Sequence, residues 1–254
     1  MAKLQLLLHN KAISTENPSF IMGIINSNNN SFWKGSRFTG KKAINQALKM
    51  IDDGADILDI GAESSRPGAK YISDKDELQS LLPLIKQIRK HSDIPISVDT
   101  RKLTVMKACF EEGANILNDI SALEDDENLP YFVADAKIPV ILMHKKGNPE
   151  NMQNNPQYDD IITEVSNYLL DRCNFAISKG ISPDKIILDA GIGFGKTYAE
   201  NLDILKNVKK YSIPGCAMLV GASRKRVIGE ACGNIGAEER LPGTISAHTI
   251  AISN

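Results

Sequence analysis

Residues 95–120 read PISVDTRKLTVMKACFEEGANILNDI, and this stretch decides the fold class. Pro95 to Val98 and Asn115 to Ile120 are short apolar runs typical of buried strands, whereas 103–111 has apolar residues at helical spacing. The same alternation extends in both directions. It predicts seven strands, each followed by helical sequence, with the strands at 21–25, 56–61, 95–98, 115–120, 139–143, 185–188 and 217–220, and the helices at 41–53, 78–88, 103–111, 128–136, 159–178 and 199–208 and in segments between 224 and 252.

Apolar runs of this kind indicate strands that are buried on both faces of a parallel sheet. Strict alternation of strands and helices leaves two architectures, a doubly wound open sheet and a barrel. No GxGxxG follows the first strand, which disfavours a dinucleotide-binding fold. We expect one domain over 1–254, with an N-terminal hairpin within 1–18 whose Leu4 to Ser14 segment plugs the barrel bottom.

Composition excludes several classes of protein. The chain has 254 residues, 42% of them hydrophobic, with 30 basic and 31 acidic residues and a net charge of −1. Nothing in this balance predicts a nucleic-acid partner. The apolar stretch at Leu4 to Leu8 is too short for a signal peptide or a membrane span. The four cysteines are not in CxxC pairs, so we expect reduced thiols and a cytoplasmic protein.

Polar residues gather at the carboxyl ends of the predicted strands. In a barrel these ends converge on one rim, where barrel enzymes keep their active sites. An alternative is that such residues cap the following helices. For Asp59, Asp119 and Thr100 the sequence favours a helix cap and an active-site role equally. The residues at the rim are Asn26, Asp59, Glu63, Asp99, Asn118, Asp119, His144, Asp189 and the run Ser223-Arg-Lys225.

Asp99, Asn118, Asp189 and Lys225 together favour a ligand, because four such groups at one barrel mouth are costly without partners. Asp99 and Asp189 could accept N–H groups of an aminopyrimidinone ring, and Asn118 could donate or accept. Lys225 supplies positive charge. The turn from Gly191 to Gly195 permits close backbone approach, and Phe194 offers a packing surface.

Seven motifs resemble those of the dihydropteroate synthase family and occur in the same order along the chain as in the family, from about Phe20 to the end of the chain. They are Ser97-Val-Asp-Thr100, Asn118-Asp-Ile120, Asp189-Ala-Gly-Ile-Gly-Phe-Gly-Lys-Thr197, Gly221-Ala-Ser-Arg-Lys-Arg226, Gly61-Ala-Glu-Ser-Ser-Arg-Pro-Gly68, Leu142-Met-His-Lys-Lys-Gly147 with Met152-Gln153, and Glu239-Arg-Leu-Pro-Gly-Thr244.

The resemblance implies a (β/α)₈ TIM barrel that condenses a dihydropterin pyrophosphate with p-aminobenzoate in folate synthesis and is a sulfonamide target. It implies Asp99, Asp189, Lys225 and Asn26 as catalytic residues, with Asn26 also holding Mg²⁺. It implies that the substrates contact Asn118, Met143, Phe194, Gly221, Ser65, Arg66, Pro67 and Ser223. It implies small-molecule substrates rather than nucleic acid or membrane partners, and it leaves a homodimer open.

The sequence departs from the family pattern at three places, and the mildest is Ala190, which replaces the Pro of the family's Asp-Pro-Gly turn. The first loop of the family reads Asn-x-Thr-Pro-Asp-Ser-Phe-Ser-Asp, whereas this chain has Asn28, Asn30 and Lys34 in place of the Thr and the two Asp. The family also continues past this chain's last helix with an eighth strand that carries Arg-x-His. We expect that unit to be absent from this chain. Three explanations are open: the sequence is cut short, another chain completes the barrel, or the protein is a degraded paralogue.

Three functions therefore compete. The first is a working dihydropteroate synthase. The second is a non-catalytic or impaired pterin-binding paralogue, which keeps the ring pocket and lacks pyrophosphate contacts. The third is a pterin-dependent methyltransferase domain, which the Ser223-Arg-Lys225 and Ser64-Ser-Arg-Pro67 motifs disfavour.

Overall fold

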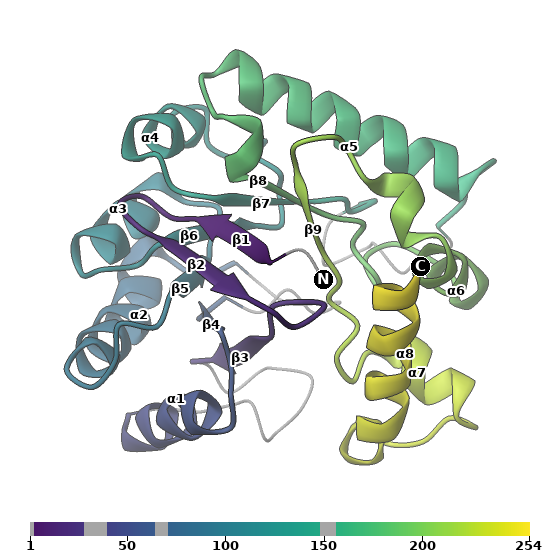
Figure 1. The fold of residues 1–254 in the computed structure, drawn as a ribbon, viewed down its shortest axis with the longest axis horizontal. Helices are drawn as coiled ribbons and strands as arrows, with labels where there is room; N and C mark the ends of the chain where they lie inside the picture. Colours follow the sequence, from purple (N-terminus) through teal and green to yellow (C-terminus); the bar gives the residue numbers. More distant parts are fainter. Residues whose placement is uncertain (1–2, 28–39, 64–70, 148–155) are drawn as a thin grey trace.

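The main sheet has seven parallel strands that pair in chain order (Figure 1). The computed structural model describes residues 3–27, 40–63, 71–147 and 156–254. The strands are β3 (Met22–Asn26), β4 (Ile57–Gly61), β5 (Ile96–Asp99), β6 (Ile116–Asp119), β7 (Val140–Met143), β8 (Ile186–Asp189) and β9 (Ala217–Leu219). All seven predicted strands are present, so the predicted class of parallel α/β barrel is confirmed. Within the described residues β3 and β9 do not pair with each other.

Helices follow one another around the outside of this sheet (Figure 1). They are α1 (Lys41–Asp52), α2 (Asp74–Arg89), α3 (Leu103–Glu111), α4 (Leu129–Ala136), α5 (Ile161–Ser178), α6 (Tyr198–Lys206), α7 (Arg226–Ala231) and α8 (Leu241–Ser253), with 3₁₀ turns at Pro183–Lys185, Val208–Tyr211 and Ala237–Glu239. No helix among the described residues has the length and apolarity needed to cross a bilayer.

Side chains capping the helices fix where several of them begin. The Ser73 hydroxyl accepts from the Asp76 amide at α2, and the Asp160 carboxylate accepts from two amides at α5. Thr197 and Glu200 form a capping box at α6. Each cap satisfies amides that have no partner inside the first helical turn. These starts fix the helix ends that face the carboxyl ends of the strands.

The two faces of the strands have different environments. Alternate residues such as Leu58, Ile60 and Val98 point outward and pack beneath the helices in the main core. The intervening residues point into the barrel, because successive side chains of a strand lie on opposite faces. Inward positions of β4 are therefore Ile57, Asp59 and Gly61, from bottom to rim.

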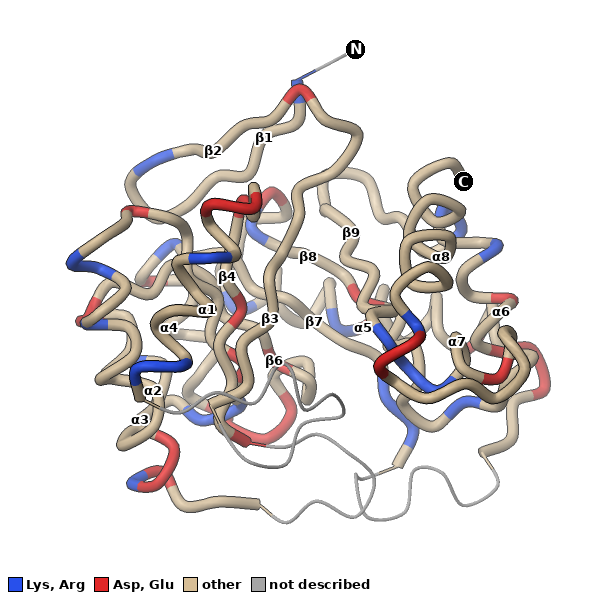
Figure 2. Tube along the Cα trace, turned by 90° about the horizontal axis from the view of Figure 1, so that it is seen from below, with Lys and Arg blue, Asp and Glu red and all other residues tan. Residues whose placement is uncertain are grey.

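The N-terminal hairpin closes the bottom of the barrel, as the sequence predicts. Strands β1 (Leu4–Leu7) and β2 (Ala12–Thr15) pair antiparallel, and Figure 2 shows them at one end of the molecule. Leu6 and Leu8 pack against inward residues at the start of four strands, Ile57, Ile116, Ile141 and Ile187. One end of the barrel is thus filled with apolar side chains, which leaves the other end for polar ones.

Candidate active site

The carboxyl ends of the strands bring the predicted polar residues to one rim. Asn26, Gly61, Asp99 and Asn118 are register partners on four successive strands, β3 to β6. Met143 and Asp189 are partners on β7 and β8. Because residues paired across a parallel sheet lie side by side, the first four residues form one inward-facing row. Asn118 pairs with Ile141 on β7, so Met143 and Asp189 lie one inward position further toward the carboxyl ends of the strands.

Asp99 stands in the first row between Gly61 and Asn118. Among the described residues nothing donates a hydrogen bond to its carboxyl group. Gly61 makes room for it, since a Cβ there would lie 3.2 Å from the Asp99 Cβ. Burial, and then the nearby Asp59, raise the pKa of Asp99 well above its usual value. A half-buried carboxyl group without a partner is suited to a ligand that donates a hydrogen bond.

Asp189 and Lys225 face each other across Gly221. Asp189 Oδ1 accepts from the Gly191 amide at 2.8 Å. A Cβ at Gly221 would lie 3.6 Å from Asp189 Oδ2 and 3.7 Å from Lys225 Nζ, so glycine leaves both groups accessible. Burial lowers the pKa of Lys225 to about 8, against the opposing effect of Asp189. Lys225 therefore stays largely cationic at neutral pH.

An apolar wall adjoins these charges. Met143 and Phe194 are buried together, with Ile120 beside them. Lys225 Nζ lies 4.7 Å from the centroid of the Phe194 ring and donates to the Ile192 carbonyl oxygen at 2.5 Å. A flat ring could lie against this wall with its polar edge toward Asp99 and Asp189. Ser223, two residues before Lys225, is exposed.

Asp59 lies one inward position below Gly61, and sequence reasoning left its role open. Its carboxylate accepts from Asn118 Nδ2, at 3.3 Å to Oδ1 and 3.2 Å to Oδ2. Burial raises the pKa of Asp59 to about 6, whereas the side chains of Ser97 and Asn118 lower it. Asp59 is therefore not a helix cap and supports the rim from inside the barrel.

Neither Asp119 nor Thr100 caps the following helix, because the N-cap residues of α4 and α3 are Asn128 and Lys102. Asp119 points outward and is fully buried, and it accepts from the Ser121 amide and hydroxyl and from the Leu123 amide. Thr100 Oγ1 accepts from the Lys102 amide just before α3. Both residues shape the turns behind the rim.

Lys196 is a residue that the sequence analysis missed. Its buried ammonium donates to His144 Nδ1 at 2.9 Å and to the carbonyl oxygens of Gly191 and Phe194 at 2.9 and 3.0 Å. Burial lowers the pKa of His144 to about 2, so its neutral ring accepts this bond. Lys196 thereby ties the end of β7 to the turn that carries Phe194.

The turn itself requires glycine at two positions. Gly191 and Gly195 have φ values of 68° and 65°. A Cβ at Gly191 would lie 1.8 Å from the His144 carbonyl oxygen, and one at Gly195 would lie 2.2 Å from that of Lys146. The Gly-rich sequence thus reflects close backbone packing between two loops as well as access for a ligand.

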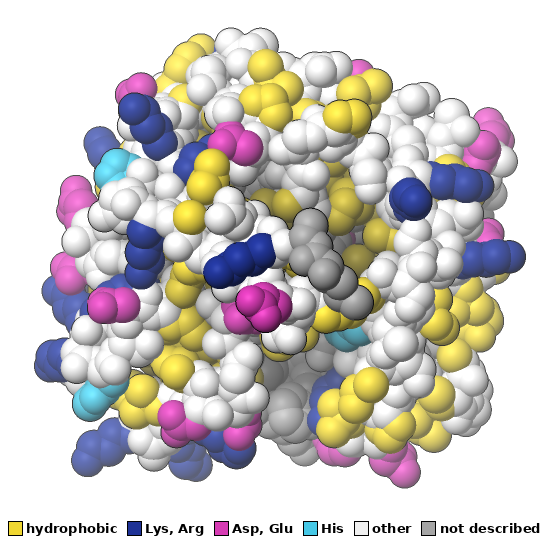
Figure 3. All heavy atoms as spheres, viewed as in Figure 1, with side chains coloured by type: hydrophobic (Ala, Val, Ile, Leu, Met, Phe, Trp, Pro, Cys, Tyr) yellow, Lys and Arg dark blue, Asp and Glu magenta, His cyan; other side chains and the backbone are white. Residues whose placement is uncertain are grey.

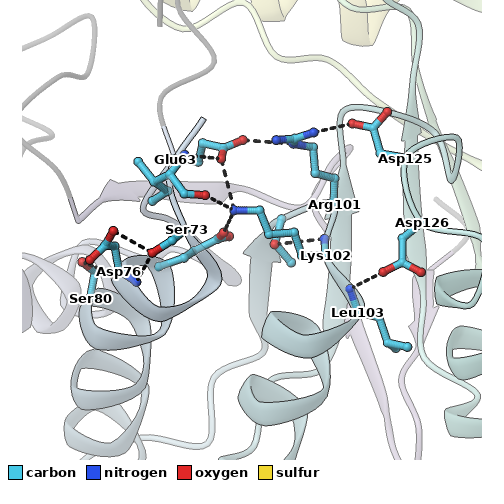
Figure 4. Close-up of polar contacts among 12 residues, drawn as sticks. Glu63, Ser73, Asp76, Ser80, Arg101, Lys102, Leu103, Asp125 and Asp126 are labelled. Carbon is cyan, nitrogen blue, oxygen red and sulfur yellow. Dashed lines mark hydrogen bonds and ion pairs between the residues drawn. The ribbon is translucent and has the colours of Figure 1, made fainter. Parts of the chain in front are cut away.

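A network of charged side chains lies beside the rim (Figure 4). Glu63 accepts from Arg101 Nε at 3.0 Å, from Lys102 Nζ at 3.3 Å and from the Ile72 amide at 3.1 Å. Lys102 also donates to Glu77 at 2.7 Å. The network therefore joins Glu63, just after β4, to Ile72, just before α2.

Other predicted site residues lie outside the described residues. These are Ser65, Arg66 and Pro67 in the second loop, Asn28, Asn30 and Lys34 in the first, and Met152 and Gln153. Asn26, the proposed metal ligand, is described and ends β3. Within the described part of the chain no three His, Cys, Asp or Glu side chains gather at distances suited to a metal.

Comparison with known proteins identifies the family. The model of the pterin-binding enzymes matches residues 22–254. A dihydropteroate synthase of Clostridium beijerinckii is 39% identical over 235 residues, which cover 92% of this chain and 84% of that protein. The chain belongs to the dihydropteroate synthase family.

Solved structures of this family have the same fold. The dihydropteroate synthase of Yersinia pestis, in complex with a sulfonamide drug, matches with a TM-score of 0.91 and 32% identity over 98% of this chain and 90% of that one. That of Xanthomonas albilineans, in complex with 7,8-dihydropteroate, matches with a TM-score of 0.85 and 33% identity over 98% and 89%. These matches agree with the family and the barrel that the sequence motifs imply.

Proposed function

We propose that this chain is a dihydropteroate synthase, which joins 7,8-dihydropterin-6-ylmethyl pyrophosphate to p-aminobenzoate and releases pyrophosphate. The observation that supports this most is that Asp99, Asn118 and Asp189 all lie at the carboxyl ends of their strands, next to Lys225 and Phe194, in a member of this family. Dihydropteroate, bound in the Xanthomonas albilineans structure, is the product of that reaction.

The pterin ring is placed by its hydrogen-bond donors. Asp99 and Asp189 accept ring N–H groups, Asn118 contacts the same edge, and Met143, Phe194 and Gly221 line the slot. Ser65, Arg66, Pro67 and Ser223 contact p-aminobenzoate. Ser223 and Lys225 precede α7, where backbone amides favour the p-aminobenzoate carboxylate.

The reaction needs positioning and charge rather than a protein nucleophile. The C–O bond between the pterin methylene and pyrophosphate breaks, and its electron pair leaves with pyrophosphate. The aryl amine then forms a C–N bond with the methylene carbon and loses a proton. Asp99 and Asp189 hold the ring while positive charge spreads over it, so these residues act through orientation and electrostatics.

The proposal includes a Mg²⁺ ion that Asn26 would help to hold. A bound Mg²⁺ would neutralise charge on the departing pyrophosphate. This ion keeps several waters and is held by substrate phosphates with few protein ligands. One carboxamide oxygen at the end of β3 therefore fits such an ion, whereas a closed protein cage is not required.

Three further properties belong to the proposal. A cytoplasmic location is supported by four free thiols, which a reducing compartment preserves. A homodimer is supported by exposed apolar residues on α8, among them Leu241, Ile245, Ile250 and Ile252. Inhibition by sulfonamides is supported by the complex in the Yersinia pestis relative.

The ring site is tested by Asp189→Ala in calorimetry with a pterin. We expect affinity to fall by about 2 to 4 kcal/mol, because ligand N–H groups would be buried without an acceptor. Lys49, exposed on α1 in an ion pair with Asp53, supplies the control variant Lys49→Ala, which should bind the pterin as the unaltered chain does. Equal affinity in Asp189→Ala would remove Asp189 from the site.

The non-catalytic paralogue is the second candidate, and Asn30 favours it. Where the family has a carboxylate, this chain has an amide without charge. Release of pyrophosphate from the dihydropterin pyrophosphate, with p-aminobenzoate and Mg²⁺, decides between the two. We expect turnover below that of the relatives, and a gain in Asn30→Asp of about tenfold, as one charge-assisted hydrogen bond would supply. Pterin binding without any turnover in either protein would favour the paralogue.

A further inference from the structure

Asp59 and Asn118 form a pair whose geometry settles which way the Asn118 amide faces. An ionised carboxylate has acceptors and no donor, whereas a carboxamide has one end that donates and one that accepts. Both oxygens of Asp59 are contacted by Asn118 Nδ2. The NH₂ end of Asn118 therefore points down into the barrel toward Asp59.

The other end of the amide is left for the site. Asn118 is the register partner of Asp99 and lies at the rim, half-buried. Among the described residues nothing donates to Asn118 Oδ1. With its NH₂ end held from below, this side chain offers a carbonyl oxygen at the level of the Asp99 carboxyl group.

Asp59 is placed for support and not for contact with a ligand. It is 7% exposed and lies one inward position below the rim residue Gly61. Its register partner on β5 is Ser97, which is fully buried, and its partner on β3 is Ile24. The Asp59 carboxylate therefore lies inside the barrel, one layer below Asp99.

We propose that Asp59 is a positioning residue that fixes Asn118 as an acceptor, so that Asp99, Asn118 and Asp189 together present an edge of acceptors. This edge selects a ring whose facing edge carries N–H donors, and it disfavours a ring with acceptors at the same positions. The inference rests on the proposed function, because it names how the pterin site recognises its ligand.

Three variants test the orientation in calorimetry with pterin itself (2-amino-4-oxopteridine). Asp59→Leu removes the acceptor at nearly equal size, so the Asn118 NH₂ group turns toward the ring donors, and we expect affinity to fall about tenfold or more. Asp59→Asn keeps an oxygen for the Asn118 NH₂ group, and its affinity should stay within about threefold.

The exchange Asp59→Asn with Asn118→Asp is the decisive variant. In it the amide at 59 donates to the carboxylate at 118, which still offers an acceptor to the ring. We expect it to bind pterin within about threefold of the unaltered chain, and better than Asn118→Asp alone, where two carboxylates repel. A loss of tenfold or more in the exchange would show that Asn118 donates to the ring, which would overturn the proposal.

Asp119→Asn is the matched control, since it removes a buried carboxylate that faces outward from β6, the strand of Asn118. It should lower the midpoint of thermal unfolding and leave pterin affinity unchanged. In turnover assays Asp59→Leu should raise KM for the pterin substrate and leave KM for p-aminobenzoate unchanged. Wild-type affinity in a folded Asp59→Leu would overturn the inference alone, whereas an unaltered chain that binds no pterin would overturn the proposed function.

Discussion

Three carboxyl groups inside the barrel, those of Asp59, Asp99 and Asp189, are held where water is scarce. Burial raises the pKa of all three, and Lys225 opposes the rise only at Asp189. Such groups cost folding free energy unless they are paired. Their concentration at one rim is expected of a binding site, where stability is given up for recognition.

Asp59 makes this cost measurable through pH. Its folded pKa of about 6 lies above the ordinary value of 3.8, so between these pH values the folded state binds more protons than the unfolded state. Stability contributed by this group is then present at low pH, falls as pH rises from about 4 to 6, and stays reduced above. Asp59→Asn removes the loss.

We expect Asp59→Asn to be more stable than the unaltered chain by about 1 to 3 kcal/mol at pH 8, and equally stable below about pH 4. Urea unfolding at pH 4, 6 and 8 measures the difference. A variant that is less stable by the same amount at every pH would contradict the assigned cost. Asp53→Asn, which alters an exposed residue of an ion pair, should show no comparable dependence on pH.

At the scale of elements, the network around Glu63 joins the end of β4, the start of α2 and the start of α3 (Figure 4). Burial lowers the pKa of Lys102, but the Glu77 and Glu63 carboxylates raise it by more, so the net shift is upward. Glu77 is 1% exposed and one of its oxygens has no partner among the described residues. The network is therefore costly to break and of little net benefit to stability.

Lys102→Met should destabilise the fold by about 3 to 5 kcal/mol, because Glu77 would be left buried without a cation. Lys102→Met combined with Glu77→Leu should recover most of this loss. Chemical denaturation of the single and double variants gives the coupling. For comparison, Lys86→Met breaks the exposed pair with Glu112 and should cost less than about 1 kcal/mol. Equal losses in Lys102→Met and Lys86→Met would contradict a buried network.

Elements were predictable from the sequence where apolar periodicity marks them. The helix predicted at 103–111 matches α3 residue for residue. The helix predicted from Leu78 instead begins at Asp74, because its first turn is polar and is fixed by the Ser73 cap. Periodicity reports burial, so it does not detect a helix start that rests on hydrogen bonds.

The residues at the rim could also be predicted from the strand pattern, whereas the residues that hold them in place, Asp59 and Lys196, could not. Residues that end parallel strands must meet, so Asp99, Asn118 and Asp189 could be placed together from the sequence. In a strand buried on both faces, the pattern does not tell which face is inside the barrel. The sequence therefore did not decide whether Asp59 caps a helix or contacts a ligand, and it did not indicate that Lys196 binds His144.

At the scale of the whole molecule, the two ends of the barrel have separate tasks. The bottom is filled by the hairpin residues Leu6 and Leu8 over inward-facing isoleucines. Lys185 fastens the hairpin by donating to the carbonyl oxygens of Leu7 and Leu8. On the face that Figure 3 shows, basic and acidic side chains are interspersed, so no field of one sign extends over it. In barrel enzymes this end serves stability and the opposite rim serves chemistry.

This division predicts that two neighbouring leucines contribute very different amounts to stability and that neither affects the rim. Leu8 is 3% exposed against the barrel floor, whereas Leu7 is 39% exposed on the other face of the hairpin. Leu8→Ala should cost about 2 to 4 kcal/mol of unfolding free energy, and Leu7→Ala less than about 1 kcal/mol. Both variants should bind pterin with unchanged affinity when measured well below their unfolding temperatures. The reason is that the layer containing Asp59 separates the bottom of the barrel, where Leu8 packs, from Asp99. A fall in pterin affinity in Leu8→Ala at full occupancy of the folded state would mean that the two ends of the barrel are coupled.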